Sequence, residues 1–300
     1  MENERALWGI DVGGTKVEAV VLDPANNQVL HRRRVPTEAD GGYEHIVGQI
    51  GKLVQEMEVA AGTPRPERIG IGTPGTFDPS TGLHKNSNTT CLNGRPFVAD
   101  LSAALESQLV AANDANCFAL AEATLGAARG FPTVFGVIMG TGVGGGLVVN
   151  GQVLNGGQGI AGEWGHNVTD PSGELTYSGR RGVVETVLSG PALERFYHAC
   201  TGRERKLPEI IALSDDGDLA AIQTRYRLLE FFGRAIAVVV NIFDPHAIVL
   251  GGGVSNLDCL YTDGPKEVAK HVFNPTFSTP ILRAEHGDSA GVLGAAMLTA

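Results

Sequence analysis

Three glycine-rich turns combine residue types that can hold a nucleotide. In the first, Asp11 precedes the turn of residues 13–15, so a carboxylate stands beside bare backbone N–H groups. Such N–H groups can bind phosphate oxygens, and the carboxylate can hold a Mg²⁺ ion through one of its waters. Residues 140–142 offer a second cradle, and residues 251–253 form a turn on which an adenosine group could lie. The candidate nucleotide-binding residues are Asp11, Gly13, Gly14, Thr15, Lys16, Gly140, Thr141, Gly142, Gly251, Gly252 and Gly253.

Other nucleotide-binding motifs do not fit the chain. Residues 70–75 and 140–145 match G-x-G-x-x-G, but neither stretch opens the helix that a dinucleotide site requires. The sequence contains no G-x-x-x-x-G-K-[ST] loop, and the D-F-G and H-R-D motifs of protein kinases are missing. Each glycine turn alone could equally be an ordinary tight turn. The three together indicate phosphate binding.

Asp114 is the candidate general base. It lies between a short expected strand and the start of an expected helix, so its carboxylate can accept a proton from a hydroxyl that attacks a phosphoryl group. The alternative is an ordinary helix cap, because Asn113, Asp114 and Asn116 are all good capping residues. The residues themselves leave both interpretations open.

Strands and helices alternate along the chain, which indicates an α/β fold. Two glycine-turned hairpins, over residues 8–22 and 134–149, lie about 130 residues apart and suggest an internal duplication. We expect helices over residues 43–61, 101–108, 115–128, 218–243 and 290–298. The domains expected are a small one, residues 1–115, onto which a C-terminal helix of residues 288–300 packs back, and a large one, residues 116–287.

Composition narrows the class of protein further. The 300 residues include 33 acidic and 23 basic side chains, so a net charge of −10 argues against nucleic-acid binding. The four cysteines lack paired spacing and are expected to be free thiols in a reducing compartment. We find no signal-peptide core and no apolar run long enough to span a membrane, and we expect a cytoplasmic protein without a membrane partner.

Five segments, in the same order, resemble the ROK family of sugar kinases: DVGGTK at 11–16, NDAN at 113–116, GTGVG at 140–144, GEWGH at 162–166 and LGGG at 250–253. The resemblance covers essentially the whole chain. Residues 85–94 and 286–289 look most similar to bacterial fructokinases of the manno(fructo)kinase type. The resemblance implies two ribonuclease-H-like domains of the actin/hexokinase type around a central cleft, with a homodimer as a possible assembly.

The resemblance also implies a sugar site. Asp114 matches the catalytic base of the family, and the positions that match its hexose-binding residues include a glycine behind the sugar ring. Each also has a plainer interpretation, such as a turn residue or a surface charge. The matching positions are Gly75, Asn88, Asn113, Glu163, His166 and Glu185.

The chain departs from the family at a structural zinc site. The family usually has a histidine followed by C-x-C-G-x-x-G-C-x-E, but Thr176, Ser178 and Val183 occupy the cysteine positions here. Because hydroxyls and valine cannot replace thiolates as zinc ligands, we expect no structural zinc. His166 and Glu185 are retained. What orders residues 170–185 without zinc is left open, and Arg180 and Arg181 are expected to be solvated.

The expected activity is ATP-dependent, Mg²⁺-requiring phosphorylation of the 6-hydroxyl of fructose or a similar hexose. A kinase for glucose, mannose or an N-acetylhexosamine is the nearest alternative, because the same polar set could hold those sugars. A sugar-binding sensor without turnover is the alternative outside enzymes. The retained Asp114 and glycine turns favour the kinase.

Overall fold

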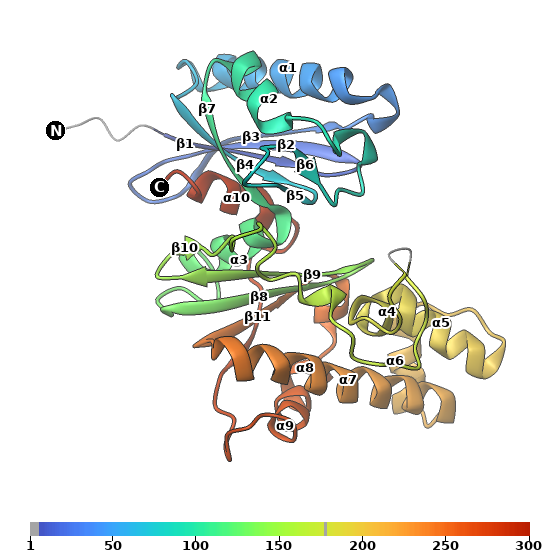
Figure 1. The fold of residues 1–300 in the computed structure, drawn as a ribbon. Helices are drawn as coiled ribbons and strands as arrows, with labels where there is room; N and C mark the ends of the chain where they lie inside the picture. Colours follow the sequence, from blue (N-terminus) through green and yellow to red (C-terminus); the bar gives the residue numbers. More distant parts are fainter. Residues whose placement is uncertain (1–5, 177–178) are drawn as a thin grey trace. The chain divides into compact units, whose positions relative to one another are not determined.

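The computed structural model describes residues 6–176 and 179–300, which form two compact units (Figure 1). The first unit contains the described residues up to Pro132, together with Gly146–Ala161 and Asp288–Ala300. The second contains Thr133–Gly145 and the described residues of Gly162–Gly287. The expected division near residue 115 differs from these units, which keep the helix that follows Asn113 in the first unit because it packs on the C-terminal helix.

The first unit is built on a five-stranded sheet of order β3-β2-β1-β4-β7. Strands β1 and β2 pair antiparallel as a hairpin, whereas β1, β4 and β7 run parallel. The expected hairpin and the alternation of strand and helix are therefore both present. The elements of this unit are β1 (Leu7–Val12), β2 (Lys16–Leu22), β3 (Val29–Pro36), α1 (Tyr43–Ala61), β4 (Arg68–Thr73), β5 (Thr76–Phe77), β6 (His84–Lys85), α2 (Phe97–Leu105), β7 (Gln108–Asn113), α3 (Asp114–Thr124), β10 (Gln152–Val153) and α10 (Ala290–Met297).

Helices pack on this sheet through apolar faces of helical period. Helix α1 buries Ile46, Ile50 and Leu53 in the core of the first unit, at the i, i+4, i+7 spacing of an amphipathic helix. Helix α10 approaches β4 so closely that a Cβ on Gly70 would stand 1.7 Å from the carbonyl oxygen of Ala295. The glycine in the strand therefore makes room for the helix backbone.

The second sheet has the order β10-β9-β8-β11-β12, which repeats the arrangement of the first position by position. Strands β8, β11 and β12 run parallel. This repetition agrees with the duplication inferred from the two glycine-turned hairpins. The remaining elements are β8 (Thr133–Met139), β9 (Val143–Val149, which crosses from the second unit into the first), α4 (Glu185–Leu188), α5 (Gly190–Thr201), α6 (Leu207–Asp215), α7 (Leu219–Phe243), β11 (Ala247–Gly251), α8 (Cys259–Thr262), α9 (Gly264–Ala269) and β12 (Ile281–Arg283).

Two expectations from composition can be compared with the structure. All four cysteines are free thiols. Within the described parts of the chain, no helix has both the length and the apolar character needed to cross a membrane.

Candidate active site

The candidate residues of the first unit gather at the carboxyl ends of three neighbouring parallel strands. Asp11 is the penultimate residue of β1, Gly75 follows β4, and Asn113 ends β7. The register pairs Asp11 with Gly72 on β4, and Thr73 with Asn113 on β7. Ligands of open α/β sheets bind at such strand ends, which is why residues distant in sequence meet here.

Asn113 rather than Asp114 is the cap of α3. Its Oδ1 accepts a hydrogen bond from the backbone N–H of Ala115 at 2.9 Å, and its Nδ2 donates to the carbonyl oxygen of Gly75 at 3.0 Å. Asp114 is the first residue of the helix and is exposed, although its Oδ1 also accepts from Ala115 at 2.8 Å. Asn113 is therefore the residue that caps the helix, and the Asp114 carboxylate can still contact a ligand.

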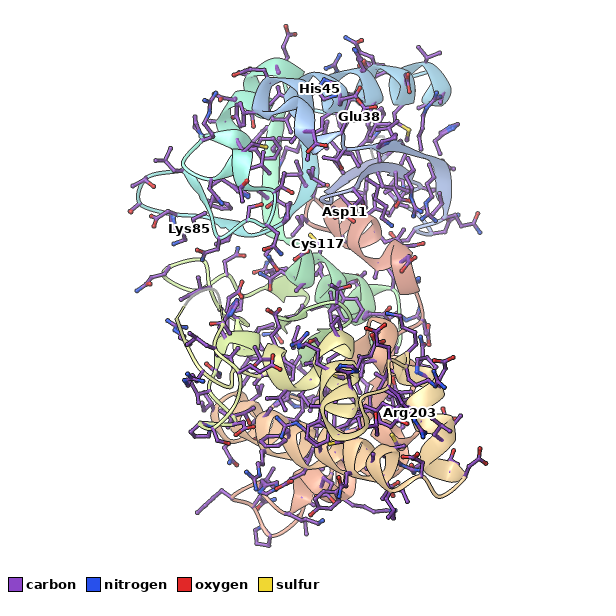
Figure 2. The ribbon with its side chains drawn as sticks, turned by 90° about the vertical axis from the view of Figure 1, so that its right-hand side faces the viewer. Asp11, Glu38, His45, Lys85, Cys117 and Arg203 are labelled. Carbon is purple, nitrogen blue, oxygen red and sulfur yellow. The ribbon has the colours of Figure 1, made fainter. Side chains whose placement is uncertain are left out.

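The pKa values of Asp11 and Asp114 are both raised in the folded protein. Desolvation raises the pKa of Asp114, against the hydrogen bonds from Ala115 and Asn113. Desolvation is also the largest cause that raises the pKa of Asp11 to about 7, followed by the charges of Asp114 and Glu18. Asp11 lies beside the buried Cys117, since a Cβ on Gly72 would contact both side chains (Figure 2).

This pair of carboxylates fits a magnesium ion. Mg²⁺ is usually held by one or two carboxylates together with phosphates and waters, and it offsets the repulsion between Asp11 and Asp114. Over residues 6–176 and 179–300, no cluster of three or more His, Cys, Asp or Glu side chains is arranged to hold a metal. Asp11 and Asp114 would therefore hold Mg²⁺ together with phosphates and waters.

The turn of residues 13–15 also fits a phosphate. The N–H of Gly13 donates to Lys16 at 2.8 Å and closes the turn, and Thr37 Oγ1 donates to the Gly13 carbonyl at 2.6 Å. A Cβ on Gly14 would lie 3.6 Å from Thr89 Oγ1, a buried hydroxyl that has no hydrogen-bond partner among the described residues. An unsatisfied buried donor next to a glycine turn is a favourable place for an anionic oxygen.

The two glycine turns of the second unit lie next to each other, after the parallel strands β8 and β11. The nearest atom to a Cβ on Gly140 would be the backbone nitrogen of Gly253, at 3.9 Å, so there is space beside both glycines. The Gly140 N–H itself donates to the Gly142 carbonyl at 2.9 Å and closes the turn. Gly252 has φ +81° and would place a Cβ 2.4 Å from the Met139 carbonyl, so no other residue fits there.

Three candidate sugar-binding residues of the second unit gather around the turn between β8 and β9. Glu185, the first residue of α4, accepts a hydrogen bond from the Val143 N–H at 3.0 Å. Glu163 caps a short 3₁₀ helix that ends at His166, with 3.6 Å between Glu163 Oε2 and His166 Nε2. Trp164 between them donates Nε1–H to the Gly144 carbonyl at 2.9 Å. Asn88, in the first unit, is exposed.

The stretch that replaces the zinc motif is partly described. Val183 is fully buried, and Thr176 Oγ1 donates to the Arg180 carbonyl at 2.9 Å, so neither side chain imitates a metal ligand. Ser178 lies outside the described residues. Arg181 is exposed and its Nη1 donates a long hydrogen bond, 3.4 Å, to the Gly173 carbonyl.

The structure also assigns contacts to residues outside the candidate set. Arg32 and Arg34 both bind the buried carboxylate of Glu18, with Arg34 Nη2 at 2.8 Å. The two arginines occupy alternate positions on β3, which pairs with β2 and places Arg34 opposite Glu18. His84 is buried and its Nε2 lies 2.8 Å from the Pro74 carbonyl, beside Gly75. Nothing in the sequence marked that contact.

Comparison with known proteins identifies the class to which this fold and site belong. The profile of the ROK family matches residues 7–300, and the chain therefore belongs to the ROK family. It is 37% identical over 308 aligned residues to the N-acetyl-D-glucosamine kinase of Haemophilus influenzae (strain 86-028NP), covering 97% of this chain and 98% of the relative. The N-acetyl-D-glucosamine kinase of Vibrio cholerae serotype O1 is 36% identical with the same coverage.

Solved structures agree with the fold. The ROK hexokinase from Thermus thermophilus superimposes with a TM-score of 0.87 at 33% identity, over 98% of this chain and 97% of that one. A ROK glucokinase from Streptomyces griseus, solved with glucose and AMPPNP, gives 0.77 at 28% identity over 98% of both chains. The expected two-domain fold of the hexokinase type is confirmed.

The finer resemblance needs correction. The sequence favours bacterial fructokinases as the most similar group, whereas these curated relatives at 36–37% identity are N-acetyl-D-glucosamine kinases. Residues 85–94 and 286–289 therefore do not identify a fructokinase.

Proposed function

We propose that this chain transfers the γ-phosphoryl group of ATP to the 6-hydroxyl of an N-acetylhexosamine, with N-acetyl-D-glucosamine as its acceptor. It is a sugar kinase, a phosphotransferase with an alcohol group as acceptor. The curated relatives, aligned over 97% of the chain, favour this acceptor over fructose. The observation that carries the chemistry is the place of Asp114, the first residue of α3 directly after β7, close enough to Asp11 for its charge to raise the pKa of Asp11.

Asp114 is the general base. Phosphoryl transfer requires little covalent chemistry from the protein beyond a positioned hydroxyl and a group that accepts its proton. Desolvation raises the pKa of Asp114, which makes its carboxylate a better proton acceptor. The Asn113 cap holds the start of α3 and so fixes the backbone from which Asp114 projects.

ATP binds through the glycine turns, and Asp11 is the residue that would hold Mg²⁺, through water. When bound, Mg²⁺ neutralises phosphate charge and orients the γ-phosphoryl group. The N–H groups of Gly13 and Gly140 close their turns, so the other backbone N–H groups of these two turns bind the phosphate oxygens. The turn of residues 251–253 supports the adenosine. The nucleotide-binding residues proposed are Asp11, Gly13, Gly14, Thr15, Lys16, Gly140, Thr141, Gly142, Gly251, Gly252 and Gly253.

The sugar hydroxyls and the acetamido group are bound by carboxylates, amides and an imidazole. Asn113 is hydrogen-bonded to Gly75, and Glu163 lies 3.6 Å from His166. Each pair can therefore contact neighbouring groups on a sugar ring. Asn88 and Glu185 complete the proposed set. The homodimer, the cytoplasmic location and the lack of a structural zinc stay predictions.

The acceptor is tested by measuring ADP release with ATP and excess Mg²⁺ across N-acetyl-D-glucosamine, N-acetylmannosamine, glucose, mannose and fructose. The proposal expects the highest kcat/KM for N-acetyl-D-glucosamine and a phosphorus signal on its C6 oxygen by NMR. A highest kcat/KM for fructose would restore the fructokinase assignment. Saturable sugar binding without turnover would favour the sensor.

A further inference from the structure

Residues 167–176 and 179–185 form two limbs joined by backbone hydrogen bonds. The N–H groups of Thr169 and Asp170 both donate to the Gly182 carbonyl at 2.9 Å, and the Val184 N–H donates to Asn167 at 2.9 Å. Gly182 has φ +56°, and a Cβ there would stand 1.5 Å from the Asp170 carbonyl oxygen. The limbs are therefore in direct contact at residues 170 and 182.

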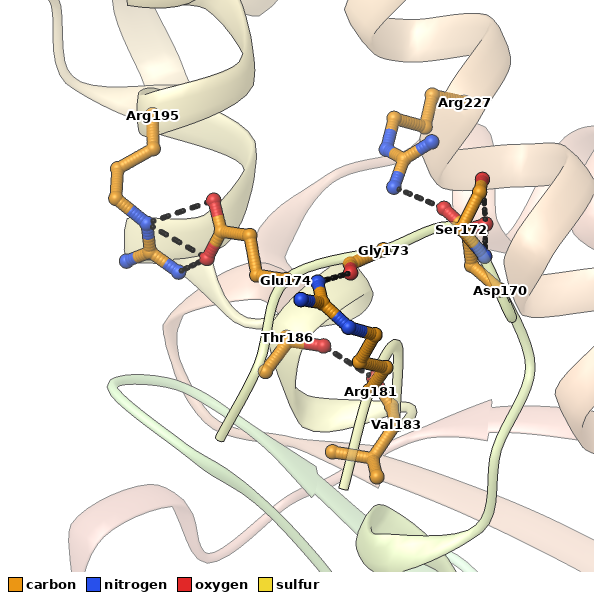
Figure 3. A network of polar contacts seen from close by, with 9 residues as sticks. All are labelled: Asp170, Ser172, Gly173, Glu174, Arg181, Val183, Thr186, Arg195 and Arg227. Atoms are coloured by element: carbon orange, nitrogen blue, oxygen red, sulfur yellow. Dashed lines mark hydrogen bonds and ion pairs between the residues drawn. The ribbon is translucent and has the colours of Figure 1, made fainter. Parts of the chain in front are cut away.

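Asp170 is a buried carboxylate at this contact. Its Oδ1 accepts from the N–H and Oγ of Ser172 at 3.2 and 2.7 Å, and its Oδ2 accepts from Arg227 Nη2 at 2.9 Å (Figure 3). Burial raises its pKa, but the hydrogen bonds from Ser172 and Arg227 outweigh burial and hold the pKa below its ordinary value. Asp170 is therefore charged, and its partner is a helix residue outside the loop.

Arg227 is fixed in place by α7 and α5. Its guanidinium stacks 4.6 Å from the ring centroid of Phe231 and 5.0 Å from that of Phe196. The side chain is 22% exposed, so solvent screens the ion pair only weakly. An arginine held on two aromatic faces keeps its orientation, which makes it a rigid attachment point for the loop.

We propose that Arg227 is a positioning residue for Glu185: by fixing Asp170 it holds the limb of residues 182–184, and that limb places the Glu185 carboxylate on the Val143 N–H. Only two residues, the buried Val183 and Val184, separate the contact at Gly182 from Glu185. The sugar-binding role of Glu185 rests on the proposed function. The placement of Glu185 by Arg227 does not depend on the proposed function.

A second ion pair on the same loop provides a matched control. Glu174 accepts from Arg195 of α5 at 2.8 Å, also through an arginine and a carboxylate (Figure 3). Both side chains are about half exposed, at 55% and 51%. Exposed pairs contribute little to stability. The Glu174 backbone carbonyl accepts from the Gly182 N–H at 2.8 Å, and this hydrogen bond does not depend on the Arg195 side chain. Arg195→Gln should therefore leave Glu185 in place.

Hydrogen exchange tests the placement without any assay of activity. In full-length Arg227→Met, the Val143, Thr169 and Asp170 amides should exchange about tenfold faster or more, while core amides of β8 keep their protection. Arg195→Gln should match the wild type. Arg227→Lys retains the charge but not the planar guanidinium, and its amides should exchange at rates between those of the wild type and Arg227→Met. Unchanged exchange at Val143 in Arg227→Met would overturn the proposal, as would equal loss of protection throughout the second unit.

Kinetics test whether Arg227 acts through Glu185. Arg227→Met should raise KM for the sugar about tenfold, with a smaller change in kcat, because a displaced carboxylate weakens sugar binding. In a Glu185→Gln background the same substitution should add little, since the group it positions is already changed. Additive effects, or a fall in kcat with KM unchanged, would contradict the proposal. A wild-type chain without sugar turnover would defeat the proposed function, and hydrogen exchange would still decide this inference.

Discussion

The side chain of Asn113 joins two neighbouring strand ends, because it donates to the Gly75 carbonyl at 3.0 Å while it accepts from the Ala115 N–H at 2.9 Å. The first hydrogen bond ties the segment after β4 to β7, and the second starts α3. One amide thus sets the positions of both Gly75 and Asp114.

The two hydrogen bonds of Asn113 can be separated by substitution. Asn113→Ser keeps a capping oxygen but loses the donor to Gly75, whereas Asn113→Ala loses both. We expect Asn113→Ala to be less stable than Asn113→Ser by about 1 kcal/mol, the usual contribution of a cap. Both variants should raise KM for the sugar. Urea unfolding and steady-state kinetics measure the two effects, and equal stability of the variants would argue against the capping role.

Asp11 should make stability depend on pH. The pKa of its carboxyl is raised from 3.8 to about 7 in the folded protein, so the folded state binds this proton more tightly than the unfolded chain does. Its contribution to stability is therefore present at low pH and is lost as pH rises through about 7. Relative to wild type without nucleotide or Mg²⁺, Asp11→Asn should gain thermal stability as pH rises from 5 to 8, by about several °C.

The control for this prediction is Asp40→Asn, which removes an exposed carboxylate. Its melting temperature should follow that of the wild type at every pH. If the difference between Asp11→Asn and wild type stays constant from pH 5 to 8, the raised pKa of Asp11 is wrong.

Gly252 and Gly253 provide a second matched pair. A Cβ on Gly252 would clash with the Met139 carbonyl at a positive φ, whereas a Cβ on Gly253 would meet no atom within 4 Å. We expect Gly252→Ala to lower the free energy of unfolding by about 1–3 kcal/mol. Gly253→Ala should fold normally but raise KM for ATP, since its methyl group would occupy space proposed for the nucleotide. Unchanged nucleotide affinity in Gly253→Ala would remove this turn from the proposed ATP site.

Much of the fold could be predicted from local patterns in the sequence. Each glycine turn follows a strand of apolar residues, so its place at a strand end could be predicted, and the 25-residue α7 is close to the expected helix of residues 218–243. The boundary near residue 115 could not be predicted well. Assigning α3 to the first unit depends on its packing against α10, which comes about 170 residues later in the chain.

Parts of the site depend on contacts that no local pattern contains. Asp170 and Arg227 are 57 residues apart, and neither has a neighbour in sequence that reveals the other. The acceptor sugar is harder still, because discrimination between hexoses depends on small differences in hydrogen-bond geometry at the same polar residues. The same polar set was therefore compatible with fructose and with an N-acetylhexosamine.

The central claim is that Asp114 is the base of an ATP-dependent sugar kinase. The most direct measurement compares sugar-dependent ADP release by the wild type and Asp114→Asn, with N-acetyl-D-glucosamine and Mg²⁺–ATP, after circular dichroism has shown that both are folded. We predict turnover that requires the sugar and falls at least about 10²-fold in the variant, with sugar binding retained. Equal turnover in Asp114→Asn, or ADP release that does not depend on sugar, would contradict the account.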